Sequence, residues 1–170
     1  MGWTNSKIFQ QAMLNPIAGR CWTTAVPTSY GSLSADSIKA ALFNNTTTPA
    51  QTVSAANSGY AAAQWVTGNE VTSANWPAGG IALTGKAFAI DTGSSSICFT
   101  AANTPGAGTV TLTGFYGALG YDATITGTPV KQGLCFNYFG GSQTVTAGTF
   151  TIIWATPASA AVTAVFNLAI

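Results

Sequence analysis

The segment 88–95 carries the sharpest chemical pattern in the chain. It reads Phe-Ala-Ile-Asp-Thr-Gly-Ser-Ser, so an apolar run delivers Asp91 to an Asp-Thr-Gly sequence. A carboxylate in this setting can do acid–base chemistry when a second carboxylate lies about 3 Å away and the two share one proton. The same residue types also favour turns, because Asp and Thr side chains bond to nearby backbone and Gly tolerates positive φ. We therefore interpret Asp-Thr-Gly first as a hairpin turn between strands at 81–90 and 95–100.

This segment also resembles the signature of aspartic proteases. One such motif in 170 residues would require a homodimer to supply the second Asp. Retroviral-type proteases do this and carry a later apolar-apolar-Gly motif, which Ala118-Leu119-Gly120 matches only loosely. A dimeric aspartic protease using Asp91 is accordingly the third of three functional hypotheses.

Other groups offer little for catalysis. The carboxylates are Asp36, Glu70, Asp91 and Asp122, and a pair of them could serve glycoside hydrolysis. Their spacing identifies no such pair, and no Asp-rich loop suggests calcium.

The three cysteines, Cys21, Cys98 and Cys135, are far apart, and the chain has no histidine to complete a zinc site. We expect free, buried thiols. We predict no catalytic, cofactor-binding or metal-binding residues.

Four aromatic residues suggest a different kind of site. Trp65, Trp76, Tyr116 and Tyr121 could stack against sugar rings, although such residues more often lie in a core or at an interface. Carbohydrate binding therefore stays open as part of a second hypothesis.

Charge is scarce. Only 5% of the residues are charged, against about a quarter in ordinary soluble domains. Scattered lysines argue against nucleic-acid binding, and no apolar run of 18 residues indicates a membrane span. We expect no signal peptide. A surface of Thr, Ser, Asn and Gly repels neighbours weakly, which favours a structural subunit of an assembly over an enzyme.

The chain alternates as β-strands do. Apolar and polar residues alternate at 38–43, 109–113, 149–154 and 162–170, and further strands are expected at 81–90, 95–100 and 133–138. Turn sequences lie between them at 44–45, 78–80, 91–93, 104–106, 127–129 and 140–141. The region 46–77 is predicted to be a long loop packed by its own aromatics. A short helix is expected at Ser6–Leu14, ended by Pro16.

These elements predict an all-β fold, an antiparallel β-sandwich or jelly-roll-like structure with a short N-terminal helical arm. We expect one domain over 1–170, with the arm in 1–35 and the β-sandwich core in 36–170. The arm could dock on its own sheet or on a neighbouring molecule.

Several segments in order resemble a family of tailed-bacteriophage virion proteins. They are Ile38–Phe43, Asn69–Val71, Trp76–Thr84, Ile90-Asp91, Ile97–Phe99, Gly120–Asp122, Phe136–Gly140 and Gly148–Trp154. The likeness spans roughly residues 36 to 154, and it is lost in 1–35 and 158–170. It implies a small β-rich structural protein of the virion, a head decoration or minor capsid protein without catalytic residues, in which Asp91 belongs to a turn.

The first hypothesis is thus a non-enzymatic capsid decoration (cement) protein. It would be made in the host bacterial cytoplasm and bind the major capsid protein on the outer head surface as a homotrimer. The second is a tail, baseplate or receptor- or carbohydrate-binding component of the virion, which would be present in far fewer copies.

Overall fold

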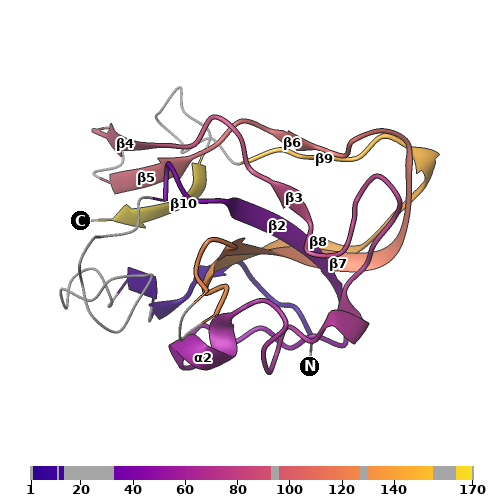
Figure 1. Cartoon of the computed structure of the whole chain (residues 1–170), viewed down its shortest axis with the longest axis horizontal. Coiled ribbons are helices and arrows are strands. Elements are labelled where there is room, and N and C mark those ends of the chain that lie inside the picture. Colours follow the sequence, from indigo (N-terminus) through magenta and orange to yellow (C-terminus); the bar gives the residue numbers. More distant parts are fainter. Residues whose placement is uncertain are drawn as a thin grey trace.

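The computed structural model describes residues 2–10, 12–13, 33–92, 96–126, 130–154 and 164–169. Within these ranges the regular structure is almost entirely antiparallel β-strand (Figure 1). Helix is limited to α2 (Ala55–Ser58), the 3-10 turn η1 (Thr67–Asn69) and residues 10, 12 and 13. The all-β prediction is confirmed, while the sandwich or jelly-roll arrangement stays a prediction.

The largest sheet described has five strands in the order β1-β8-β7-β2-β3. Their bounds are β1 Lys7–Ile8, β2 Ile38–Asn44, β3 Ile81–Ala82, β7 Val110–Asp122 and β8 Gly133–Gly148. The central strands β7 and β8 form a long hairpin, and β2 lies against β7 from Ile38 opposite Asp122 to Asn44 opposite Phe115. Five of the seven residues of β2 are buried, which includes both faces of the strand. The strand therefore lies inside the fold and not at its surface.

Two smaller sheets complete the described fold. The three-stranded sheet has the order β10-β5-β4, with β4 Ala87–Asp91, β5 Ser96–Thr100 and β10 Ala164–Ala169. The strands β6 (Thr104–Pro105) and β9 (Thr151–Ile152) form a two-stranded pair. Figure 1 shows β4, β5 and β10 together at one end of the molecule, apart from α2.

The loop 46–77 closes one side of the five-stranded sheet through its aromatic residues. Trp65 is fully buried and packs against Trp3, Phe9, Phe43 and Phe136, with ring centroids 5.0 to 6.2 Å apart. Most of these contacts are edge-to-face, a favourable geometry for aromatic pairs. The prediction of a long loop packed by its own aromatics is confirmed.

The prediction of a helix at Ser6–Leu14 is wrong for its first residues. Lys7 and Ile8 form β1 opposite Phe136 and Cys135, and the Phe9 N–H donates to the Leu134 carbonyl (3.0 Å). The apolar spacing suited a helix, but the edge of β8 offers unpaired backbone groups that an extended chain can bond to. Phe9 is thereby fully buried, so this part of the arm docks on its own sheet. Residues 14–32 lie outside the described residues, as do the predicted turn at 127–129 and parts of the last strand.

Glycine explains two further differences from the predicted turns. Gly140-Gly141 was expected to be a turn, yet it lies inside β8. With φ of 82° and 153° these residues form a bulge, in which β8 residues 139–142 face Tyr116 between the pairs Phe115–Gln143 and Gly117–Tyr138. The expected strand 81–90 is instead two strands, β3 and β4, because Gly85 has a φ of 59° between them. The expected turn at 104–106 contains strand β6.

Candidate functional site

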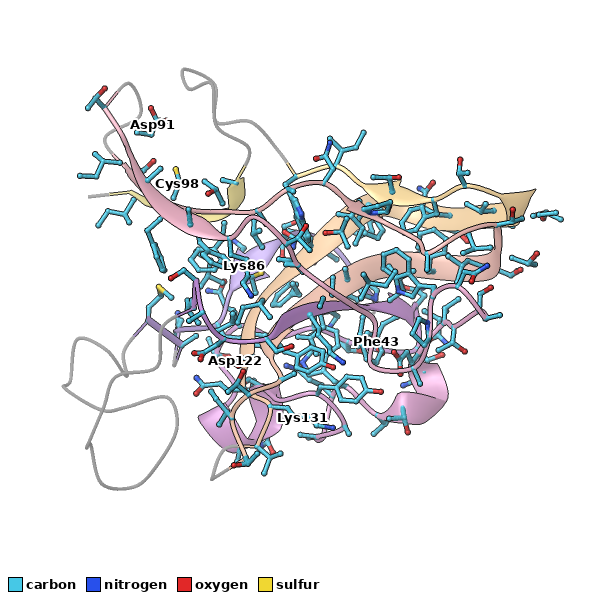
Figure 2. All side chains as sticks on the ribbon, turned by 45° about the horizontal axis from the view of Figure 1, so that its top comes forward. Phe43, Lys86, Asp91, Cys98, Asp122 and Lys131 are labelled. Carbon is cyan, nitrogen blue, oxygen red and sulfur yellow. The ribbon has the colours of Figure 1, made fainter. Side chains whose placement is uncertain are left out.

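The Asp-Thr-Gly segment is confirmed as the start of a hairpin connection. Asp91 is the last residue of β4 and pairs with Ser96, the first residue of β5. Residues 93–95 lie outside the described residues. Asp91 is buried and engaged by neighbouring groups. In Figure 2 Asp91 lies near the top of the view, well separated from Asp122 in the lower half. Within one chain, Asp91 therefore has no carboxylate partner at Asp122.

The structure does bring two of the four carboxylates together, at a corner between β2 and β7. Asp36 lies just before β2, Asp122 is the last residue of β7, and their carboxyl groups lie within hydrogen-bonding reach of each other. Burial, with the nearby Asp36 charge adding to it, raises the pKa of Asp122 to about 6. We name this arrangement the Asp36–Asp122 corner. Asp122 is fully buried, so a sugar or peptide substrate could not contact both carboxyl groups in this structure.

A second polar cluster lies around Glu70. The Tyr60 hydroxyl donates to Glu70 Oε2 (2.7 Å), and the Gly79 N–H donates to Glu70 Oε1 (2.8 Å). The Tyr121 hydroxyl donates to the Gly79 carbonyl (2.8 Å), and the Tyr60 and Tyr121 rings stack at 4.8 Å. Lys131 Nζ lies 5.1 Å from the centroid of the Tyr60 ring, a cation–π distance. We call these five residues the Glu70 cluster.

The Glu70 cluster ties the loop 46–77 to the end of β7. Burial raises the pKa of Glu70, and burial together with the Glu70 charge raises the pKa of Tyr60 well above its ordinary value. Both phenols therefore stay protonated as hydrogen-bond donors. The cluster joins three of the segments that carried the virion-protein resemblance, Asn69–Val71, Trp76–Thr84 and Gly120–Asp122. Its geometry is that of a structural crosslink.

The proposed sugar-stacking platform is not formed. Trp65, Trp76 and Tyr121 are buried in the core, and Tyr116 is partly buried against it. Tyr60, the other aromatic residue of the loop 46–77, is also buried. The alternative interpretation of these residues as core anchors is confirmed for Trp65, Trp76 and Tyr121.

Two of the cysteines behave as expected. Cys98 and Cys135 are free and buried, and burial raises the pKa of the Cys135 thiol to about 12. A thiol held protonated in this way is a poor nucleophile. Cys21 lies outside the described residues.

The feature that sequence reasoning missed is an exposed apolar face on the three-stranded sheet. Phe88 is 52% exposed, Ile90 76% and Ile97 39%, and Ile90 lies directly opposite Ile97. Directly paired residues of antiparallel strands point to the same side, so these side chains share one face of the β4–β5 hairpin. The other face carries Asp91, Ser96 and Cys98, which are buried. We name Phe88, Ile90 and Ile97 the exposed β4–β5 face.

This face reverses the usual orientation of a strand in β4, although Phe99, which pairs with Phe88 on the same face, is fully buried. In an alternating strand the large apolar residues are expected to face the core, and in β4 these are Phe88 and Ile90. The structure turns them outward and buries Asp91 instead. Asp91 and Ser96 pair on the other face of the hairpin, and the burial of both depends on tertiary packing.

Comparisons with known proteins give no relative for this arrangement: no family model, no curated protein and no solved structure matches the chain. Among the described residues, no group of three or more His, Cys, Asp or Glu side chains is placed to hold a metal ion. None of the helices described is long and apolar enough to cross a membrane. The likeness to virion proteins therefore stays a prediction.

Proposed function

We propose that this chain is a structural protein of a tailed-bacteriophage virion, a capsid decoration protein that binds the outer surface of the head. It would act without catalysis, as a homotrimer seated at local threefold positions of the shell. Closed rotational symmetry suits such positions, since each subunit then makes the same contact. Its partner would be the major capsid protein.

The observation that carries this proposal is the exposed β4–β5 face on a protein with few charges. Large apolar side chains that share one exposed face mark interaction sites more often than scattered ones do. The chain as a whole is rich in Thr, Ser and Asn and has only nine charged residues. Such a surface can approach a partner without stripping water from ions, a costly step.

The physical task of a decoration protein follows from mass action. A protein that binds only the assembled shell stabilises that state by an amount that grows with its concentration relative to Kd. Many copies of a weakly charged subunit, each burying a small apolar face, would hold adjacent capsomers together against internal pressure. No catalytic residue is needed for this task.

The first experiment is the copy number of the chain relative to the major capsid protein in purified virions, by quantitative mass spectrometry. We expect a ratio near one-to-one or a simple fraction of it. A handful of copies per virion would favour the tail, baseplate or receptor-binding hypothesis. Absence from virions would overturn the structural proposal and return attention to the dimeric protease with Asp91.

A pair of matched variants then tests the docking face. Ile90→Thr and Ile153→Thr make the same change at residues that are 76% and 74% exposed, but only Ile90 belongs to the exposed β4–β5 face. We expect Ile90→Thr to lower occupancy on the shell and Ile153→Thr to leave it unchanged. Equal occupancy for both would show that this face is not the docking surface, even if the copy number is high.

A further inference from the structure

The Asp36–Asp122 corner contains two buried acceptor atoms that lack a hydrogen-bond donor. Asp36 Oδ2 and Asp122 Oδ2 are both shielded from solvent, and neither accepts a hydrogen bond from any group in the described part of the chain. Buried polar atoms are nearly always paired, because leaving one unpaired costs the full loss of its hydration. Two carboxylate oxygens within reach of each other can satisfy this need when one proton lies between them.

The second carboxylate oxygen of Asp122 and the backbone around the pair form hydrogen bonds. Asp122 Oδ1 accepts from the Thr124 N–H (2.8 Å), and the Thr124 hydroxyl accepts from the Ser37 N–H (2.7 Å). The Ala123 N–H donates to the Ser37 carbonyl (2.8 Å). Asp122 is thus held with one oxygen bonded to its own turn, while its other oxygen is buried and the Asp36 carboxyl group lies within hydrogen-bonding reach. The pair and these three bonds together join the start of β2 to the end of β7.

Charge balance points to the same arrangement. The Lys86 ammonium donates to the main-chain carbonyl of Asp36, so one positive charge lies beside the backbone of this corner. Lys131 is placed over the Tyr60 ring, and Glu70 is bonded to Tyr60 and Gly79, so both belong to the Glu70 cluster. Lys39 follows Ile38 on β2 and faces Tyr121 in the register. One added proton makes the corner of Asp36, Asp122 and Lys86 neutral.

We propose that Asp36 and Asp122 share a single proton, and that this proton closes the corner between β2 and β7 so that the corner loosens when the proton leaves near neutral pH. The step is a simple dissociation, in which the proton goes to water and a second negative charge remains on the pair. The two carboxylates then repel each other in a site where Asp122 and both Oδ2 atoms are buried. The bonds of Ser37, Ala123 and Thr124 are the first to weaken.

The direction of the pH dependence follows from the raised pKa of Asp122. A carboxyl group with a higher pKa in the folded than in the unfolded chain binds its proton more tightly when folded. Its contribution to stability is complete below the unfolded-state value and is lost as the pH rises through about 6. The chain has no histidine and only four carboxylate side chains, so few other groups titrate in this window. Glu70 is one of them, and its raised pKa acts in the same direction.

Asp122→Asn tests the proposal with a nearly isosteric change. The Asn oxygen can still accept from Thr124, while its amide N–H₂ donates to Asp36 in place of the shared proton. We expect the melting temperature of the unaltered protein to fall as the pH is raised from about 5 to about 8, and that of Asp122→Asn to stay level. Glu70→Gln is the matched control and should keep most of the fall. A level wild-type curve, or a fall abolished by Glu70→Gln but kept by Asp122→Asn, would overturn the proposal.

Two measurements on the unaltered protein need no variant to fold. Carboxyl-carbon NMR should show one Asp titrating near pH 6, and hydrogen exchange corrected for pH should speed up at Ser37, Ala123 and Thr124 but not at the opposite end of the β2–β7 pairing. Titration of all Asp residues near their ordinary values would contradict the shared proton. A last experiment compares melting temperatures at about pH 8 in calcium or magnesium with those in a chelator. A rise with the metal ion that is absent from Asp122→Asn would show that a cation, and not a proton, bridges the two carboxylates. That result would overturn the proposal.

Discussion

Two regions of the molecule handle polar and apolar side chains in opposite ways. At the end of β7, carboxyl and phenol groups are buried and bonded, in the Asp36–Asp122 corner and the Glu70 cluster. On the exposed β4–β5 face, Phe88, Ile90 and Ile97 reach into solvent. Tyr60 of the loop 46–77 stacks on Tyr121 in the first region, whereas the side chains of Phe88, Ile90 and Ile97 in the second stay exposed in the described structure.

The contrast separates residues that maintain the fold from residues that are available to a partner. Buried polar groups that are bonded to one another fix the fold, and their loss damages the protein itself. Exposed apolar groups contribute little to the stability of the isolated chain, so a partner is the simplest reason for their presence. Substitutions that separate stability from binding can therefore break or sharpen this comparison.

The largest effect on stability is expected from Trp65→Ala in the loop 46–77. The substitution removes a fully buried ring that contacts four other aromatic side chains, and losses of this kind cost about 3–5 kcal/mol. Denaturant unfolding should show a large fall in the midpoint. Trp65→Phe keeps a ring in the same place and should lose clearly less. Equal, small losses for both would mean that the loop 46–77 does not anchor the sheet.

An intermediate effect is expected from Gly80→Ala, in the Trp-Pro-Ala-Gly-Gly segment. A Cβ at Gly80 would lie 1.8 Å from the Ala40 carbonyl oxygen, so the β2–β3 contact must open. We expect a loss of about 1–3 kcal/mol, as for other overpacked sites. Gly114→Ala is the matched control, because Gly114 has nearly the same φ (69° against 70°) but nothing within 4 Å of its Cβ. Similar losses for the two variants would show that backbone strain, and not the close approach, sets the cost.

The smallest effect on stability is expected from Ile90→Thr on the exposed β4–β5 face. Exposed substitutions usually change the free energy of unfolding by less than about 0.5 kcal/mol, and Thr keeps the β-branched shape that strands favour. Thermal unfolding of the purified variant should match that of the parent protein. A loss of unfolding free energy above about 1 kcal/mol would mean that Ile90 packs within the protein itself. The contrast between the exposed β4–β5 face and the buried polar groups would then disappear.

The sequence predicted the strands whose pattern is local and missed what depends on distant contacts. The alternation in 38–43 and 109–113 correctly indicated β2 and the start of β7, because each strand shows its pattern in its own residues. The second half of β8 escaped notice, since Gly140-Gly141 is typical of a turn and the residues that follow are mainly polar. Its pairing with β7 stabilises it there.

The candidate sites followed the same division. The hairpin connection at Asp-Thr-Gly was correctly expected from its local sequence, although Asp91 itself ends strand β4. The meeting of Asp36 with Asp122 joins residues 86 positions apart, and the Glu70 cluster depends on the way the loop 46–77 folds back. Neither could be deduced from spacing. The exposed β4–β5 face contradicts the usual expectation that large apolar residues point inward, and only the packed structure reveals it.

The burial of the tryptophans gives the protein an optical signal of its own. Trp3, Trp65, Trp76 and Trp154 are all buried, and Trp3 packs edge-on against Trp65 at 5.6 Å. Their emission should therefore be blue-shifted in the folded state and move to longer wavelength together as the chain unfolds. The Trp3–Trp65 pair lies between the N-terminal segment and the loop 46–77, so its near-ultraviolet circular dichroism would report whether those two segments separate before the sheet does. No dye or label is needed to follow the process.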